Sequence, residues 1–198
     1  MPQIGIRPDL TINRPIQSVK YKICLVGDEA VGKTSLIRRF VYSAYEDKYI
    51  RTILTSVSKK EIKFPGAGYN MTLLIWDIMG RKDFLSLFKE SYFMNAKGII
   101  AVFDTTRRGT LQSLDLWISS IGKKIGDIPT IILANKSDLH EQNSVTDGEI
   151  IKAAEGKAFR WLRTSAKTGE NVERGFRELA VELLRTYVQV FQEVDTAH

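Results

Sequence analysis

The stretch Gly27-Asp28-Glu29-Ala30-Val31-Gly32-Lys33-Thr34 decides the fold of this chain, because it has the G-x-x-x-x-G-K-T spacing of a phosphate-binding loop. The apolar run Ile23-Cys24-Leu25-Val26 comes directly before it, and Ser35-Leu36-Ile37-Arg38-Arg39-Phe40 follows. This order predicts a strand, a glycine-bounded loop and a helix. A plain glycine-rich turn is the alternative, and the flanking strand and helix disfavour it.

The residue types in the loop explain its chemistry. Gly27 allows a sharp turn off the strand, and Gly32 lets the backbone approach an anion closely. The loop N–H groups and the start of the helix present partial positive charge to phosphates. Lys33 adds a full charge near the outer phosphates, and the hydroxyl of Thr34 is placed to bind Mg²⁺. The predicted nucleotide-binding residues of the loop are Gly27, Glu29, Ala30, Val31, Gly32, Lys33, Thr34 and Ser35.

Composition places the chain among soluble globular proteins. Its 198 residues are enough for one sizeable core, and its longest apolar runs, such as 98–103, are too short to cross a bilayer. Met1-Pro2-Gln3 begins neither a secretory signal nor a myristoylation site. Cys24 is the only cysteine and reads as a buried core side chain, so we expect a reducing, cytoplasmic setting.

The net charge of +6 raises the possibility of a nucleic-acid or anionic-membrane partner. The Lys and Arg residues are scattered, however, and they form no long basic block. We therefore expect no specific nucleic acid among the partners.

Apolar runs and amphipathic stretches alternate from Tyr21 onward. Apolar runs predict strands over 22–26, 71–76, 98–104, 130–135 and 158–162. Three- and four-residue apolar steps predict helices over 33–41, 110–121 and 172–191. The alternation predicts an α/β fold of three layers, a mostly parallel central sheet with helices on both faces. The domain plan is an extended arm at 1–19, one nucleotide-binding domain at 20–192 and a tail at 193–198.

Asp77 and Gly80 form a D-x-x-G pair where a predicted strand ends. A carboxylate in this place can hold Mg²⁺ mostly through the water shell of the ion. The Gly80 N–H can meet a terminal phosphate. Taken alone the pair is weak evidence, because Asp-x-x-Gly often just ends a strand in a turn.

Two further motifs, Asn135-Lys136-Ser137-Asp138 and Ser165-Ala166-Lys167, follow later predicted strands and indicate the base. Asp138 offers two acceptor oxygens to a ring N–H and an amino group that guanine has and adenine lacks. The Ala166 N–H can donate to the guanine carbonyl, and the Lys136 stem can cover the ring. These interactions disfavour an ATPase or a nucleotide kinase. The predicted base-binding residues are Asn135, Lys136, Asp138, Ser165, Ala166 and Lys167.

With these four motifs in order, residues 21–191 resemble a Ras-superfamily small GTPase, closest to the Rab and Ran-like branches. Residues 49–53 stand where the family has its first switch, and 90–98 resembles the tyrosine-rich approach of Rab proteins to the fourth strand. The resemblance implies a Mg²⁺-dependent GTP/GDP switch that hydrolyses GTP, in signal transduction or vesicle trafficking. Effectors, GTPase-activating proteins and exchange proteins would read residues 47–58 and 77–87.

The same resemblance assigns residues that the motifs alone do not. Thr52 would bind Mg²⁺ and the terminal phosphate in the GTP state, with Thr55 and Ser56 as alternatives. Tyr45 would place its ring against the guanine edge, although a surface aromatic is its alternative role and Tyr42 and Tyr49 are neighbours. The implied metal ligands are thus Thr34, Thr52 and Asp77, and the implied catalytic residues are Lys33, Thr52, Gly80 and Arg81.

Three positions depart from the family pattern near the phosphates. Arg81 stands where relatives place a water-orienting glutamine, and a guanidinium has no acceptor for that water. It could stabilise phosphoryl charge or be a solvated side chain. Glu29 replaces a small residue and brings a carboxylate beside the phosphates, and Met79 replaces a small residue before Gly80. We predict slow intrinsic hydrolysis with retained nucleotide affinity; a non-cycling pseudo-GTPase is the alternative.

The tail Glu193-Val194-Asp195-Thr196-Ala197-His198 lacks the prenylated cysteines of most Rab-like and Ras-like proteins. Stable lipid anchoring is therefore not expected, unless the chain continues beyond this point. We expect a monomer that is cytoplasmic or that reaches membranes through a partner.

Overall fold

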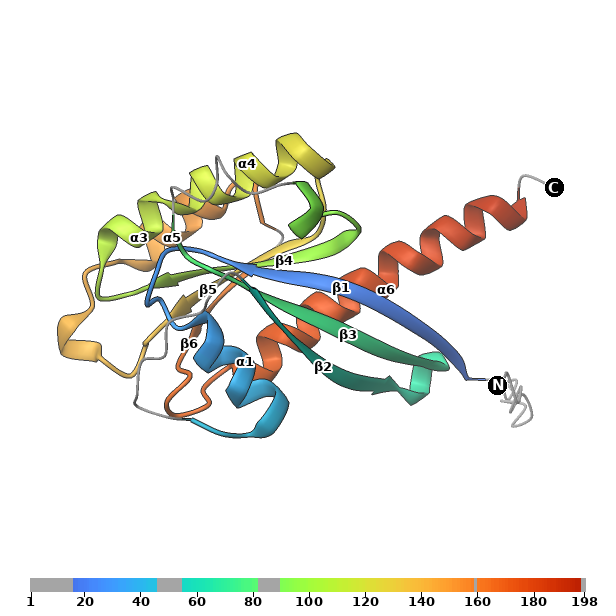
Figure 1. Ribbon diagram of the computed structural model, residues 1–198, viewed down its shortest axis with the longest axis horizontal. Coiled ribbons are helices and arrows are strands. Elements are labelled where there is room, and N and C mark those ends of the chain that lie inside the picture. Colours follow the sequence, from blue (N-terminus) through green and yellow to red (C-terminus); the bar gives the residue numbers. More distant parts are fainter. Residues whose placement is uncertain (1–15, 46–54, 82–89, 159, 197–198) are drawn as a thin grey trace, which may run out of the picture.

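The computed structural model describes residues 16–45, 55–81, 90–158 and 160–196, with no side chain described for 90 or 190–196. A six-stranded sheet with the order β2-β3-β1-β4-β5-β6 forms its centre (Figure 1). Strand β2 is antiparallel to β3, and the other neighbouring strands are parallel. The strands are β1 Gln17–Val26, β2 Thr55–Phe64, β3 Tyr69–Ile78, β4 Ala96–Asp104, β5 Thr130–Asn135 and β6 Arg160–Thr164.

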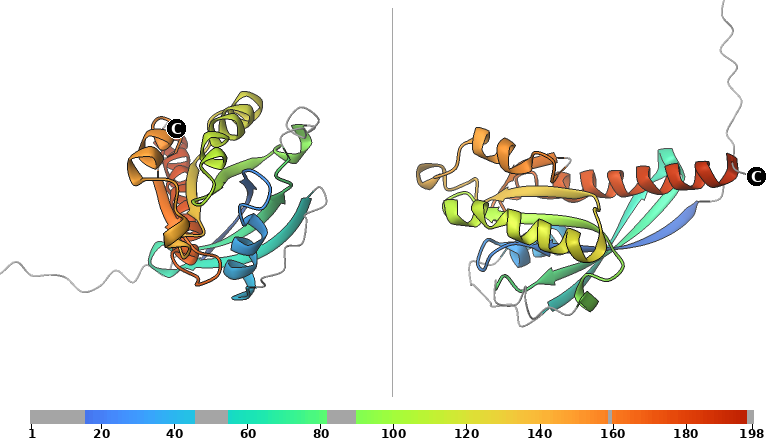
Figure 2. Two further views of the ribbon diagram at one scale, coloured as in Figure 1. Left: turned by 90° about the vertical axis from the view of Figure 1, so that its left-hand side faces the viewer. Right: turned by 90° about the horizontal axis from the view of Figure 1, so that it is seen from above.

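Helices cover both faces of this sheet. The helices are α1 Lys33–Tyr42, α3 Arg108–Gln112, α4 Leu114–Ile125, α5 Asp147–Ala154 and α6 Val172–Thr196, with short 3₁₀ turns at Pro65–Ala67, Glu90–Tyr92 and His140–Gln142. Apolar side chains of α1 and α6 share one core cluster, and those of α3, α4 and α5 share the other. Figure 2 shows α6 as one long helix that extends along the sheet. The predicted three-layer α/β fold is confirmed.

Packing between α1 and α6 fixes the helix that follows the phosphate loop. The rings of Phe40 and Phe176 stack with centroids 4.1 Å apart and planes 6° from parallel. Both side chains are buried, so this contact adds apolar burial to ring stacking. It ties the end of α1 to α6, and thereby holds the start of α1 at the carboxyl end of β1.

Two elements were absent from the sequence prediction. Strand β2 is an edge strand with a single buried side chain, that of Ile62, so apolar alternation does not mark it. Helix α5 has only eight residues and begins with a capping box between Thr146 and Glu149. The T-x-x-E spacing of this box is a sequence signal for a helix start. The helix predicted over 110–121 is two helices that meet at Ser113.

Several boundaries also differ from the predicted ones. Strand β1 begins at Gln17, so its first residues pair with β3 before the apolar run that predicted the strand. Strand β6 begins and ends two residues later than the predicted 158–162. Helix α6 continues to Thr196, past the last apolar residue of its predicted stripe. Of the arm predicted at 1–19, residues 1–15 lie outside the described residues.

Candidate nucleotide site

The phosphate loop joins β1 to α1, at the edge of the sheet where the parallel strands end (Figure 1). Gly27 has φ +132°, and a Cβ on it would lie 2.0 Å from the Val102 carbonyl oxygen. Gly32 has φ +99°, and its Cβ would lie 2.2 Å from Nδ2 of Asn135. Both positions therefore require glycine, for backbone conformation as well as for space. The close approach at Gly32 brings the loop against the first residue of the N-K-x-D motif.

Side-chain donors hold the carbonyl oxygens of the loop. Lys33 donates from Nζ to the carbonyl oxygens of Gly27 and Asp28, each at 2.8 Å. Asn135 donates from Nδ2 to the Val31 carbonyl at 2.8 Å. Fixing these carbonyls leaves loop N–H groups for an anion, which is what a phosphate-binding loop requires.

Lys33 is a buried cation at the head of α1. Burial lowers its pKa to about 8, because desolvation disfavours the charged form, while the nearby carboxylates of Asp77, Asp28 and Glu29 oppose the shift. A phosphate group would add negative charge beside this ammonium and favour its protonated form. The environment of Lys33 therefore suits an anionic ligand.

Thr34 and Asp77 meet beside Lys33. The Thr34 hydroxyl donates to Oδ2 of Asp77 at 2.5 Å, joining α1 to the end of β3. A hydroxyl and a carboxylate are hard oxygen donors that fit Mg²⁺. Within the described ranges, no cluster of three or more His, Cys, Asp or Glu side chains could cage a metal ion. Two such donors suit an ion that keeps several water ligands.

The two base motifs meet at one asparagine. Oδ1 of Asn135 accepts from the Ala166 N–H at 3.2 Å and from the Thr164 hydroxyl at 3.4 Å, while its amide holds Val31. The Ser165 hydroxyl donates to Oδ1 of Asp138 at 2.5 Å. Asn135 therefore joins the phosphate loop to the Ser165-Ala166-Lys167 loop, and Ser165 fixes the carboxylate predicted to read the base.

Lys136 has a left-handed backbone with φ 69°, and its Nζ lies 2.6 Å from Oδ2 of Asp104. Asp104 ends β4 and its side chain is fully buried. Burial by itself raises the pKa of Asp104, but hydrogen bonds from Lys136 and Thr106 outweigh this and hold the pKa below its usual range. The carboxylate is therefore charged and anchors the Lys136 side chain.

Only some of the residues assigned by resemblance lie within the described part of the chain. Tyr45 is half-buried, and its ring lies 5.8 Å from the guanidinium of Arg39. Arg39 donates to the carbonyl oxygens of Ala166 and Lys167. Tyr45 therefore lies near the loop 165–167, which we call the base loop. Thr52 and Tyr49 lie outside the described residues, and Tyr42 is 65% exposed. The alternatives Thr55 and Ser56 begin β2, paired with Ile78 and Asp77.

Gly80 lies directly on the phosphate loop. A Cβ on it would be 2.4 Å from the Asp28 carbonyl carbon and 2.5 Å from the Glu29 nitrogen. Met79 is buried beside it, whereas Arg81 is exposed. The rest of the predicted second switch, residues 82–87, lies outside the described residues.

Four residues near the loop were not singled out from the sequence. They are Arg39, Asp104, Arg107 and Trp117, and each bonds to a motif residue or to a partner of one. An arginine, aspartate or tryptophan outside any motif carries no local signal of such a contact. Asp104 alone had a positional signal. It comes at the end of an apolar run, and the carboxyl ends of parallel strands lie at the edge of the sheet where ligands bind.

Comparison with known proteins decides the family. The sequence profile of the Ras family matches residues 22–185. The chain belongs to the Ras family. Ras-related protein Rab-13 of Canis lupus familiaris is 32% identical over 165 residues, which cover 83% of this chain and 80% of the relative. Ras-related protein RabG2 of Dictyostelium discoideum is 30% identical over 169 residues, which cover 85% and 84%. As a Rab-like member of this family, the protein is a GTP-binding molecular switch in general terms.

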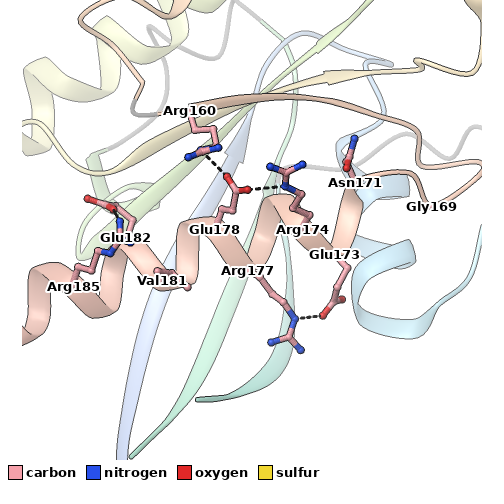
Figure 3. Close-up of a pocket in the computed structure, with 10 residues that line it drawn as sticks. All are labelled: Arg160, Gly169, Asn171, Glu173, Arg174, Arg177, Glu178, Val181, Glu182 and Arg185. Atoms are coloured by element: carbon pink, nitrogen blue, oxygen red, sulfur yellow. Dashed lines mark hydrogen bonds and ion pairs between the residues drawn. The ribbon is translucent and has the colours of Figure 1, made fainter. Parts of the chain in front are cut away.

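A separate hollow of about 680 Å³ runs along α6 beside β6 (Figure 3). Its arginines are paired with glutamates: Arg160 and Arg174 with Glu178, Arg177 with Glu173, and Arg185 with Glu182. Four arginines therefore share three glutamates, and each arginine of the hollow has a carboxylate partner. Among the described helices, none is long and apolar enough to cross a bilayer.

Proposed function

We propose that this protein binds GTP and GDP with Mg²⁺ and hydrolyses GTP to GDP and phosphate, with a slow intrinsic rate. The observation that carries the proposal is the double role of Asn135, which bonds Val31 in the phosphate loop and Ala166 in the base loop. A ligand bridging these loops must have both an anionic tail and a base. Guanine supplies the donors that Asp138 accepts.

The protein would promote hydrolysis by binding and neutralising the charged phosphates. Lys33 and the loop amides would hold the outer phosphates, and the Gly80 N–H would meet the terminal phosphate. Thr34, Asp77 and Thr52 would hold Mg²⁺, which when bound neutralises charge on the phosphates. Water would be the nucleophile, with no covalent intermediate on the protein.

Two side chains support a slow intrinsic rate. Arg81 is exposed and has no acceptor with which to orient an attacking water. Glu29 is half-buried in the loop, and its charge contributes to the environment of Lys33. A carboxylate this close to the site adds unfavourable charge beside a triphosphate. Hydrolysis would then depend on an activating protein.

A non-cycling pseudo-GTPase that holds nucleotide as an interaction module is the second candidate, favoured by the same Arg81 and Glu29. In the cycling enzyme, effectors, GTPase-activating proteins and exchange proteins would contact residues 47–58 and 77–87. Multiple-turnover phosphate release, with and without cell extract as a source of activators, separates the candidates: a cycling enzyme turns over at least with extract, and a pseudo-GTPase never does.

Base selection tests the proposal directly. Xanthine carries a carbonyl oxygen where guanine has its amino group, so Asp138→Asn offers it a donor. We expect Asp138→Asn to lose GDP affinity by about 100-fold or more and to gain xanthosine diphosphate binding. The matched control is Asp127→Asn, an exposed position in the turn before β5. Unchanged guanine preference in Asp138→Asn, or purified protein that yields only adenine nucleotides by chromatography, would overturn the assignment.

A further inference from the structure

Arg107 joins the phosphate loop to the base motif through two hydrogen bonds. Its Nη2 donates to the Glu29 carbonyl oxygen at 2.9 Å, and its Nε donates to Oδ2 of Asp104 at 2.9 Å. The Nζ of Lys136 lies 2.6 Å from the same Asp104 oxygen. One buried carboxylate oxygen thus anchors both the lysine of the N-K-x-D motif and an arginine that reaches the loop.

The bond to Glu29 fixes a peptide group. Because a trans peptide is planar, its carbonyl and its N–H point in opposite directions. Holding the Glu29 carbonyl toward Arg107 therefore turns the Ala30 N–H away from Arg107. Lys33 and Asn135 donate to the carbonyl oxygens of Gly27, Asp28 and Val31. Arg107 donates to the carbonyl oxygen of Glu29, which follows Asp28 in the loop.

This peptide needs support, because Ala30 is in the left-handed region with φ 61°. A residue with a Cβ is strained in this region, because its Cβ comes too close to the following carbonyl oxygen. A charge-assisted hydrogen bond to the preceding carbonyl favours this conformation over relaxed ones. The loop conformation and the arginine are thus mutually dependent.

The adjacent arginine shows that the arrangement is specific. Arg108 donates to the Ser144 carbonyl at 2.9 Å and pairs with Glu149, away from the loop. Its side chain is 54% exposed, against 44% for Arg107. Two neighbouring arginines of similar exposure therefore differ in what they hold, which provides a matched pair for comparison.

We propose that Arg107 is a positioning residue, which holds the peptide between Glu29 and Ala30 in the anion-binding orientation and couples it through Asp104 to Lys136. This inference rests on the proposed nucleotide site. Arg107 acts through the loop backbone and through Asp104. Its loss should therefore loosen the phosphates of a bound nucleotide without changing base preference.

Release of a fluorescent GDP analogue from the Mg²⁺-bound protein tests the inference. We expect Arg107→Ala to release it about fivefold to tenfold faster than the wild type, and Arg108→Ala to stay within about twofold. Arg107→Lys keeps the charge, but one ammonium cannot reproduce the planar fork, so it should restore release only in part. The ³¹P resonance of the bound β-phosphate should shift in Arg107→Ala and not in Arg108→Ala.

Asp104→Asn tests the coupling. Because it removes the anchor of Arg107, the double variant with Arg107→Ala should release GDP no faster than the faster single variant. The inference fails if Arg107→Ala and Arg108→Ala behave alike, if the β-phosphate resonance is unmoved, or if the double variant multiplies the single effects. A wild type that binds no guanine nucleotide would instead remove the proposed function.

Discussion

The indole Nε1 of Trp117 donates a 2.9 Å hydrogen bond to Oδ1 of Asp28. Trp117 is fully buried in α4, within the core cluster on that face of the sheet. Asp28 is the second residue of the phosphate loop and is half-buried. The bond satisfies the one polar group of the indole and fastens the loop to a helix 89 residues further along the chain.

Breaking this bond should loosen the loop. We expect Asp28→Ala to speed GDP release several-fold, because the buried indole N–H loses its acceptor. Asp28→Asn keeps an acceptor oxygen in the same place and serves as the control, with release close to the wild type. Stopped-flow measurements give the rate of GDP release. If both variants release GDP equally fast, the carboxylate acts by its charge rather than by this bond.

Trp117 should also carry stability. Trp117→Phe removes the donor and leaves a small cavity, so we expect the free energy of unfolding to fall by about 1–3 kcal/mol in urea titrations. Trp161 in β6 is half-buried, so Trp161→Phe is the matched control and should lower the free energy of unfolding by less. Equal losses in the two variants would contradict a special role for the buried indole.

Gly80→Ala should impair hydrolysis. Its Cβ would meet backbone atoms of Asp28 and Glu29 at 2.4–2.5 Å, and backbone cannot rotate away as a side chain can. The strand end and the loop would have to separate, and we expect GTP turnover to fall by about tenfold or more. Gly148→Ala in α5 meets nothing within 4 Å and should leave turnover unchanged. Normal turnover in Gly80→Ala would show that this contact is dispensable.

Arg81→Gln should speed intrinsic hydrolysis by at least several-fold, because glutamine supplies the acceptor that arginine lacks. Arg81→Ala removes the arginine without supplying an acceptor, and it should stay slow. Single-turnover phosphate release without activators is the measurement. If Arg81→Gln hydrolyses GTP at the wild-type rate, position 81 does not explain slow turnover.

The lowered pKa of Asp104 predicts where its stabilising effect depends on pH. A carboxyl whose folded-state pKa lies below the ordinary value of 3.8 contributes stability that is fully present above that value and is lost as pH falls through the folded-state pKa. The difference in unfolding free energy between the wild type and Asp104→Asn should therefore be constant between about pH 5 and 7 and shrink below about pH 4. A difference that already shrinks between pH 7 and 5 would contradict the ion pairing with Lys136 and Arg107.

The sequence alone determined the elements whose signals are local. Glycine spacing identified the phosphate loop, continuous apolar runs identified the buried parallel strands, and a regular apolar stripe identified α6. Edge strand β2 was not predicted because only one of its side chains is buried, and α5 was not predicted because eight residues give too little periodicity. Its capping box was a local signal all the same.

Only the tertiary structure decided how the motif residues are held. Arg107 and Glu29 are 78 residues apart, Asn135 and Val31 are 104 apart, and no pattern within either segment encodes the contact. Parallel strands bring their carboxyl ends to one edge, so a helix start, a turn and two loops meet there. Which donor then reaches which carbonyl depends on side-chain geometry at that edge. The motifs therefore predict the chemistry of the site, and packing around them fixes its shape.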